Sequence, residues 1–188
     1  MSLDQNVFES VVGDRTAWLI DFAFVVTDTG GTAAVLIASA VLTVSLVLRA
    51  RNREAILVAG AMLSGLAVMT GLKNLYERPR PPLPERLIET STYSFPSGHA
   101  MLTAILVCVI MALTLRMVLE RYVRVALVTL LVLYTFAVGF SRIYLAAHWT
   151  TDVLAGWAFG VLWAAVWIFS TRPLLGRAKL GRDRRSHV

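Results

Sequence analysis

The sequence predicts an all-α membrane protein, a polytopic helix bundle with five transmembrane helices and amphipathic helices at its N-terminus. Hydrophobic residues make up 57% of the 188 residues, which exceeds the usual share in a soluble globular domain. Five stretches of 16 to 19 residues contain no Asp, Glu, Lys or Arg: 32–48, 55–72, 100–115, 125–141 and 153–171. With uncharged neighbours, each approaches the ~20 residues that a helix needs to cross a bilayer. Because these runs do not alternate between apolar and polar residues, they favour helices over a β-barrel.

The N-terminal segment 1–30 has a different pattern. Acidic residues and Arg15 interrupt its apolar residues, so that no window is long and uncharged enough to span a membrane. We therefore expect one or two amphipathic helices at the membrane interface. A short sixth span near 17–27 is the alternative. By its length, the whole chain, 1–188, is expected to form a single domain.

The positions of the 18 Lys and Arg residues predict the topology. Twelve fall at one end of a five-helix zigzag, in the connections 49–53 and 116–124 and from Arg172 onward; the other six are Arg15, Lys73, Arg78, Arg80, Arg86 and Arg142. Lys and Arg accumulate in cytoplasmic loops. The first end, with the basic tail 173–188, is therefore expected in the cytoplasm and the second end outside. Topology and anionic lipid then explain the net charge of +6, and no nucleic-acid partner is expected.

The connection between the second and third spans is the long one. Residues 77–96 hold five of the six prolines, which interrupt helices and favour extended backbone. Loops of this length are uncommon unless they are functional. A short amphipathic helix is expected around 84–89.

Polar and ionisable residues gather at the expected outer ends of the spans, where such groups mark functional sites. They come from segments far apart in the sequence: Lys73, Arg80, Ser97, Gly98, His99, Arg142, His148 and Asp152. Arg78, in the long connection, fits a solvated loop charge as well as a headgroup contact.

Two spacings point to chemistry. His148 and Asp152 are four residues apart, so on a helix they share a face, where the carboxylate can fix the imidazole tautomer and leave the other nitrogen free to attack. Arg142 and His148 are six residues apart, which on a continuous helix would separate them by about 240°. We therefore expect a break between them that lets both point at one centre.

Together these residues predict a phosphate site. Lys73, Arg80 and Arg142 would form a positive pocket whose guanidinium groups suit phosphate oxygens. Ser97 and Gly98, at the start of the third span, would add hydrogen-bond donors and the helix dipole. One histidine would attack phosphorus and the other would protonate the leaving oxygen. A channel or transporter is the alternative from another class, although the centres of the spans are uncharged.

Three motifs resemble the signature motifs of the type 2 phosphatidic acid phosphatase (PAP2) superfamily: Lys73-x6-Arg80-Pro81, Pro96-Ser97-Gly98-His99 and Ser141-Arg142-x5-His148-x3-Asp152. They occur in order and without a substitution, which argues against an inactive scaffold of the same fold. Membrane members usually have six spans. This chain has five predicted spans, and its residues 3–31 resemble the segment that follows the usual first helix.

The resemblance implies a role for each motif residue. Lys73, Arg80 and Arg142 would bind the phosphate, assisted by Ser97 and the Gly98 amide. His99 would be the general acid, and His148, oriented by Asp152, would form a phosphohistidine. No metal ion and no other cofactor would be needed.

The resemblance also implies a substrate class and a location. We expect a lipid phosphate hydrolysed at the outer face of a bacterial inner membrane, with the site facing the periplasm. Undecaprenyl diphosphate, phosphatidylglycerol phosphate and phosphatidic acid are the candidates. The sequence does not choose among them, and it does not indicate an oligomeric state.

Overall fold

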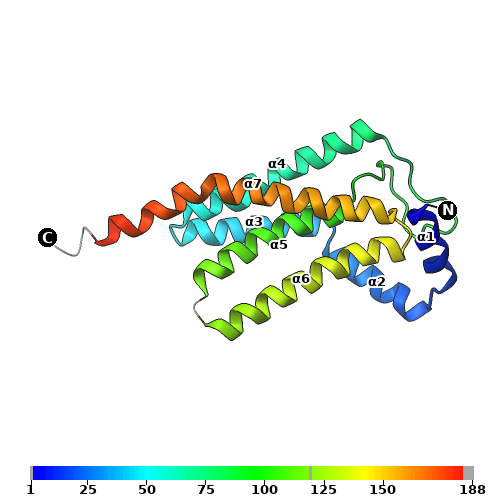
Figure 1. The fold of residues 1–188 in the computed structure, drawn as a ribbon, viewed down its shortest axis with the longest axis horizontal. Helices are drawn as coiled ribbons and strands as arrows, with labels where there is room; N and C mark the ends of the chain where they lie inside the picture. Colours follow the sequence, from blue (N-terminus) through cyan, green and yellow to red (C-terminus); the bar gives the residue numbers. More distant parts are fainter. Residues whose placement is uncertain (1, 119, 184–188) are drawn as a thin grey trace.

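The computed structural model describes residues 2–118 and 120–183, which form an all-α bundle (Figure 1). Its helices are α1 (Leu3–Gly13), α2 (Ala17–Thr29), α3 (Thr32–Leu48), α4 (Asn52–Tyr76), α5 (Gly98–Met117), α6 (Arg121–Tyr144) and α7 (Thr150–Asp183). The predicted fold class is therefore confirmed. In the predicted tail 173–188, α7 continues as helix to Asp183, and residues 184–188 lie outside the described part.

Among the described helices, four are long and apolar enough to cross a membrane, and a fifth span is possible. The four are α4, α5, α6 and residues 150–171 of α7, and α2 with α3 makes a fifth if this pair, bent by 44°, counts as one span. The predicted spans 55–72, 100–115, 125–141 and 153–171 lie in these four helices, and the fifth, 32–48, counts as a span only together with α2. A separate sixth span near 17–27 is not among them, because α2 has only 13 residues and a spanning helix needs about 20.

The bundle is elongated, and the connections between its helices lie at its two ends (Figure 1). The N-terminus, α1 and the connections 77–97 and 145–149 lie at one end, which we call the site end. The connection 49–51, the end of α5, the start of α6 and the C-terminal part of α7 lie at the other, which we call the opposite end.

α5 is the central helix and packs against α3, α4, α6 and α7. Glycines allow α7 to approach its backbone: a Cβ on Gly156 would lie 2.8 Å from the Ser97 carbonyl oxygen, and one on Gly160 would lie 2.6 Å from that of Met101. Small residues have this role at helix contacts in membranes, where burial of apolar surface does not drive association. Gly156 and Gly160 therefore form a helix contact within the chain.

A polar contact joins α4 to α7 within the bundle. The Ser64 hydroxyl accepts hydrogen bonds from the indole nitrogens of Trp163 (3.0 Å) and Trp167 (2.9 Å), and it donates to the Gly60 carbonyl oxygen. Each polar group thereby has a partner, as a low-dielectric environment requires. Both tryptophan side chains thus take part in the packing of α7 against α4.

The prediction of a short helix around 84–89 is wrong. Residues 83–85 form only a turn, closed by a hydrogen bond of 3.1 Å from the Arg86 amide to the Pro82 carbonyl oxygen. The next amide, that of Leu87, donates instead to the Leu145 carbonyl oxygen (3.0 Å) in the connection between α6 and α7. The helical ladder therefore stops after one bond, and the long connection is tied to the residues that precede His148.

Candidate active site

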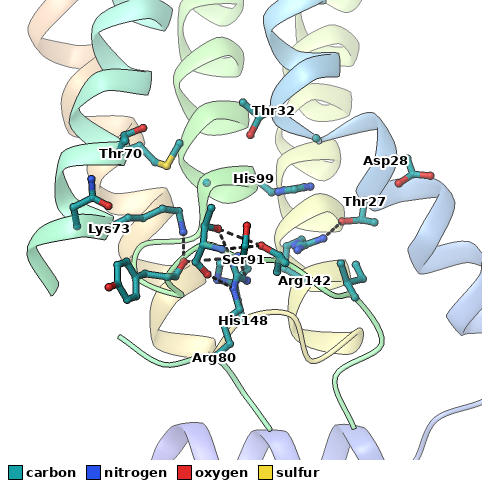
Figure 2. A pocket seen from close by; sticks show the side chains of 18 residues that line it. Thr27, Asp28, Thr32, Thr70, Lys73, Arg80, Ser91, His99, Arg142 and His148 are labelled. Atoms are coloured by element: carbon teal, nitrogen blue, oxygen red, sulfur yellow. Dashed lines mark hydrogen bonds between the residues drawn. The ribbon is translucent and has the colours of Figure 1, made fainter. Parts of the chain in front are cut away.

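A cavity of about 540 Å³ lies at the site end, below the α2–α3 bend and between α4, α5 and the connection 77–97 (Figure 2). Six of the eight residues singled out in the sequence line it: Lys73, Arg80, Gly98, His99, Arg142 and His148. The remaining two, Ser97 and Asp152, are fully buried beside it. Segments separated by up to 79 positions thus contribute to one polar cluster, as the sequence predicts.

Lys73 lies in the last turn of α4, before Glu77 ends the helix with a left-handed conformation (φ 45°). Its side chain is 9% exposed. The ammonium group donates to the carbonyl oxygens of Tyr93 (2.6 Å) and, more weakly, Ser94 (3.5 Å). An ammonium group has three donors, so Lys73 both holds the returning loop and can bind an anion in the cavity.

Ser97 is the N-cap of α5. Its hydroxyl oxygen accepts a long hydrogen bond from the Ala100 amide (3.5 Å), and its own amide donates to the Asp152 carbonyl oxygen (3.0 Å). The cavity is lined by Gly98 and His99, in the first turn of the same helix, where unpaired amides and the helix dipole favour an anion. A serine hydroxyl that accepts in a cap still has a proton to donate.

The expected break between Arg142 and His148 is confirmed. α6 ends at Tyr144 and α7 begins at Thr150, and the chain between them turns through Ala146, which has a positive φ of 50°. The Arg142 carbonyl oxygen accepts from the amides of Ala147 (3.0 Å) and His148 (3.3 Å). This compact turn places the side chains of Arg142 and His148 on the same cavity.

The expected pairing of His148 with Asp152 is present, but not on a shared helical face, because His148 precedes the first residue of α7. Asp152 reaches back to the start of the helix, and its Oδ2 accepts from the Trp149 amide (3.0 Å), in the manner of a capping box. The same Oδ2 lies 3.5 Å from His148 Nδ1. The side chains of His148 and Asp152 are 2% and 0% exposed.

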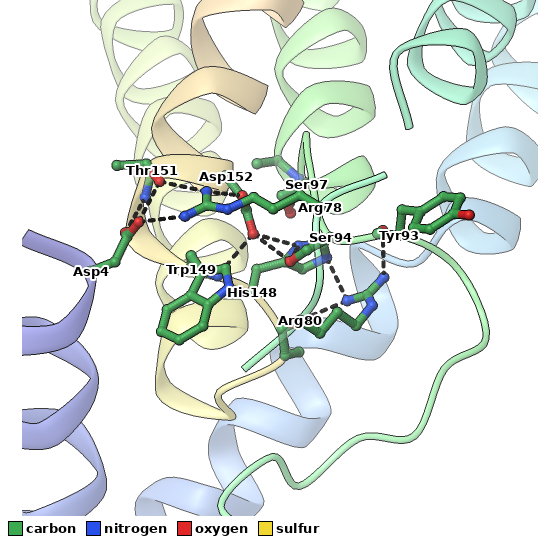
Figure 3. Close-up of polar contacts among 12 residues, drawn as sticks. Asp4, Arg78, Arg80, Tyr93, Ser94, Ser97, His148, Trp149, Thr151 and Asp152 are labelled. Atoms are coloured by element: carbon green, nitrogen blue, oxygen red, sulfur yellow. Dashed lines mark hydrogen bonds and ion pairs between the residues drawn. The ribbon is translucent and has the colours of Figure 1, made fainter. Parts of the chain in front are cut away.

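The two ring nitrogens of His148 have different surroundings (Figure 3). Nδ1 faces Asp152 Oδ2 and the Ser94 hydroxyl oxygen, which is 3.4 Å away and itself donates to Asp152 Oδ2. Nε2 lies 3.1 Å from Arg80 Nη1. Because a guanidinium only donates and a carboxylate only accepts, the proton belongs on Nδ1, which leaves a lone pair on Nε2 at the cavity.

Electrostatics favours this neutral imidazole. Burial lowers the pKa of His148 to about 3, and the positive charges of Arg80, Arg142 and Lys73 act in the same direction, against the hydrogen bond to Asp152, which raises it. Burial and the nearby Arg86 also lower the pKa of Arg80, to about 10. At neutral pH a neutral imidazole therefore faces a cationic guanidinium, the protonation states that a nucleophile and an anion-binding group need.

Arg80 is held by several acceptors. Nη1 donates to the Ala147 carbonyl oxygen (2.6 Å), Nε to that of Thr92 (2.8 Å), and Nη2 to the Thr92 hydroxyl (3.0 Å) and the Tyr93 carbonyl oxygen (3.2 Å). These contacts fix the planar group against His148. They also join the connection 77–97 to the turn before α7.

Arg142 is 4% exposed. Its Nη1 donates to the Thr27 hydroxyl (2.7 Å) at the end of α2, while its Nε is buried and has no hydrogen-bond partner within residues 2–118 and 120–183. A buried donor without a partner is costly. Arg142 also lines the cavity, where a guanidinium group suits an anion.

Three residues that the sequence did not single out as part of the site also belong to this network. Ser94 lies between Asp152 and His148, Thr27 contacts Arg142, and Arg78 donates from Nη1 to Asp152 Oδ1 (Figure 3). Ser94 and Arg78 lie next to motif residues, which was the available signal. Thr27 ends an apolar stretch of the N-terminal segment and carries no such signal. For Arg78, the structure favours an ion pair over a solvated loop charge.

Known proteins resemble this chain in sequence and in structure. The family model of the PAP2 superfamily matches residues 54–173. Phosphatidylglycerophosphatase B of Bacillus subtilis is 27% identical over 163 residues, 86% of this chain and 79% of that protein. Undecaprenyl-diphosphatase of Sulfolobus acidocaldarius is 34% identical over 84 residues, 44% of this chain and 36% of that protein.

Two crystal structures share the fold. One is a transmembrane PAP2 type phosphatidylglycerolphosphate phosphatase from Bacillus subtilis, with a TM-score of 0.80 and 24% identity, covering 93% of this chain and 85% of that one. The other is LpxE of Aquifex aeolicus, with a TM-score of 0.72 and 22% identity, covering 89% and 96%.

The family match covers well over half of the chain and includes all three motifs. The relatives are named as phosphatases of lipid phosphates, and one of the solved structures is described as transmembrane. The fold, the cationic cavity and the apolar helices are consistent with that class. This chain is therefore a multi-pass membrane protein and a phosphatase that belongs to the PAP2 superfamily.

Proposed function

We propose that the protein hydrolyses a phosphate or diphosphate ester of a membrane lipid, without a metal ion, through a phosphohistidine on His148. The observation that carries the proposal is the orientation of this imidazole. Nδ1 faces Asp152 at 3.5 Å, while Nε2 faces a cavity lined by Lys73, Arg80 and Arg142. A neutral, oriented imidazole beside an anion-binding pocket is the arrangement that attack on phosphorus requires.

In the first step, His148 Nε2 attacks phosphorus and the bond from phosphorus to the leaving oxygen breaks. His99, which lines the same cavity, donates a proton to that oxygen. Lys73, Arg80 and Arg142 hold the phosphoryl oxygens, and the Gly98 amide and Ser97 hydroxyl add neutral donors. Asp152 stabilises the positive charge that develops on the imidazole.

In the second step, water attacks the phosphorus of the phosphohistidine and the bond from phosphorus to Nε2 breaks. His99, now neutral, accepts a proton from this water and so regains the form that starts the cycle. The products are inorganic phosphate and the lipid alcohol, or the lipid monophosphate when the substrate is a diphosphate. One general acid and base thus serves both steps.

The substrate is proposed to be a lipid because the cavity lies at the end of an apolar bundle. A phosphate can enter at headgroup level while its hydrocarbon remains between the helices. Undecaprenyl diphosphate, phosphatidylglycerol phosphate and phosphatidic acid fit this description, and the names of the Bacillus and Sulfolobus relatives support the first two.

The test is phosphate release by purified protein from each of these three lipids and from a soluble phosphate ester. We expect lipid to be preferred, vanadate to compete with it, and EDTA to leave the rate unchanged. His148→Ala should lose at least about 10³-fold in kcat. Brief reaction with ³²P-labelled lipid should label the native protein, but not this variant, with a base-stable, acid-labile phosphate. Normal turnover by His148→Ala, or loss in EDTA reversed by added metal, would overturn the mechanism.

We further propose that the site end faces the periplasm of a bacterial inner membrane and that the opposite end, with the C-terminal tail, faces the cytoplasm. The excess of Lys and Arg at the opposite end supports this orientation. In cells carrying Cys108→Ala, a cysteine at the exposed position Glu89 should react with a membrane-impermeant maleimide, and one at the exposed position Asn52 should not. The reverse pattern would invert the topology.

A further inference from the structure

Helix α1 lies at the site end, outside the cavity and against the start of α7 (Figure 1). Its Phe8 ring packs against Trp149, with 5.7 Å between the centroids. None of its residues lines the cavity. Its contact with the candidate catalytic residues runs instead through one carboxylate, that of Asp4.

Asp4 makes three hydrogen bonds beyond its own helix. Oδ1 accepts from the Thr151 amide (2.9 Å), and Oδ2 accepts from the Thr151 hydroxyl (2.7 Å) and from Arg78 Nη2 (2.7 Å). The Thr151 amide is one of the first amides of α7, which have no partner within the helix. Asp4 therefore caps α7 from a different helix and adds a negative charge where the dipole favours one.

Arg78 continues the chain of contacts to Asp152. Nη1 donates to the Thr151 hydroxyl (2.7 Å) and to Asp152 Oδ1, while Nη2 is bound to Asp4. The guanidinium also lies over the Trp149 ring, 5.8 Å from its centroid. The planar group therefore bridges two carboxylates, a geometry that a lysine could not reproduce.

Both ends of this bridge remain charged. Burial raises the pKa of Asp4, but the hydrogen bonds from Thr151 and Arg78 outweigh it and lower the pKa overall. Burial lowers the pKa of Arg78, but the contacts with Asp4 and Asp152 outweigh burial, so that the pKa is raised overall. The ion pairs thus persist at neutral pH.

Asp152 needs such a partner because its other oxygen is already occupied. Oδ2 accepts from Ser94 and from the Trp149 amide and faces His148, so only Oδ1 is left to set the rotation of the carboxylate. Arg78 holds that oxygen. A small rotation of the carboxylate would weaken an Nδ1 contact that is already 3.5 Å long.

We propose that Asp4 and Arg78 are positioning residues that connect α1 to Asp152 and hold this carboxylate toward His148, so that full turnover requires α1 to be docked on α7. The inference rests on the proposed function, in which Asp152 orients the nucleophile. It differs from a purely structural role of α1 in one respect: the effect of Asp4 must pass through Arg78.

The test compares Asp4→Asn, Arg78→Met and the double variant, with kcat and KM measured on the preferred lipid. Asparagine keeps an acceptor for the Thr151 amide but offers no anion to Arg78. We expect kcat to fall about tenfold in each single variant, with KM changed less than twofold because the phosphate ligands are untouched. In the double variant kcat should equal that of Arg78→Met. Asp4→Glu, which keeps the charge, should recover most of kcat.

The matched control is Glu9→Gln, which removes the same charge from an exposed position of the same helix and should leave kcat unchanged. Should Asp4→Asn not fold, Arg78→Lys gives the same test, because an ammonium group cannot bridge both carboxylates.

If His148→Ala is inactive, any of three results would overturn the inference. These are an unchanged kcat in Asp4→Asn, an equal loss of kcat in Glu9→Gln, or losses of kcat in the two single variants that multiply in the double variant. An active His148→Ala would instead mean that the proposed function itself is wrong.

Discussion

The two ends of the bundle hold their arginines in different ways. At the site end, Arg78, Arg80 and Arg142 donate to side chains or carbonyl groups 74, 67 and 115 positions away in the sequence. At the opposite end, Arg51 pairs with Glu54, three positions away, and contacts the Met117 sulfur, while Arg124 donates to the Val118 carbonyl oxygen, six positions away.

This difference separates two uses of positive charge. Local pairs at the opposite end, such as the part-buried pair of Arg51 with Glu54, need only a helix and its adjacent turn. The long-range contacts at the site end exist only when α1, α2, α4 and α7 are correctly packed. Substitutions at the two ends should therefore have very different effects on turnover.

The largest difference is expected between two conservative changes. Arg80→Lys removes the planar group that contacts Ala147, Thr92, Tyr93 and His148, and kcat/KM for the lipid phosphate should fall about 100-fold. Arg121→Lys, at an exposed position of the opposite end, should change it less than twofold. Phosphate release measures both. A loss below threefold in Arg80→Lys would contradict the distinction.

An intermediate effect is expected from packing beneath the site. An alanine Cβ at Gly156 would lie 2.8 Å from the Ser97 carbonyl oxygen and 3.0 Å from the Ala100 Cβ, so the start of α5, with Gly98 and His99, has to move. Gly156→Ala should lower Tm in detergent by several degrees and reduce kcat about tenfold.

Gly71→Ala is the matched control for this change, because a Cβ there meets nothing within 4 Å. It should keep kcat and, by removing glycine from a helix interior, stabilise the protein by up to about 1 kcal/mol. Equal losses of Tm in the two variants would contradict the packing explanation.

The smallest expected effect is that of pH on the protonation of His148, which should not change between pH 7.5 and pH 5. Burial lowers the pKa of His148 to about 3, so protonation, which would remove the nucleophilic lone pair, occurs only well below the ordinary value near 6.5. In micelles, the ring signals of ¹⁵N-labelled His148, assigned with His148→Asn, should report a neutral imidazole from pH 7.5 down to pH 5. A midpoint near pH 6.5 would show that the site is more hydrated than the structure indicates.

The sequence by itself determined the helices and the candidate residues. Uncharged runs identified α3 to α7, because a backbone in lipid must satisfy its own hydrogen bonds. Helix ends extended beyond those runs to include Lys73, Arg142 and Asp152, since helices continue until a cap or a turn stops them. The three motifs identified all eight residues placed in or beside the cavity, because each motif lies within a short segment where spacing has a direct structural meaning.

Only the tertiary structure decided how those segments meet. It placed Asp152 and Ser97 behind the cavity lining, joined Leu87 to Leu145 in place of the expected helix at 84–89, and brought Asp4 to Arg78 across 74 positions of sequence. Such contacts depend on the packing of α1 and α7 and on the path of a proline-rich connection. Neither has a periodic pattern, because partners that meet only through packing impose no spacing on the sequence.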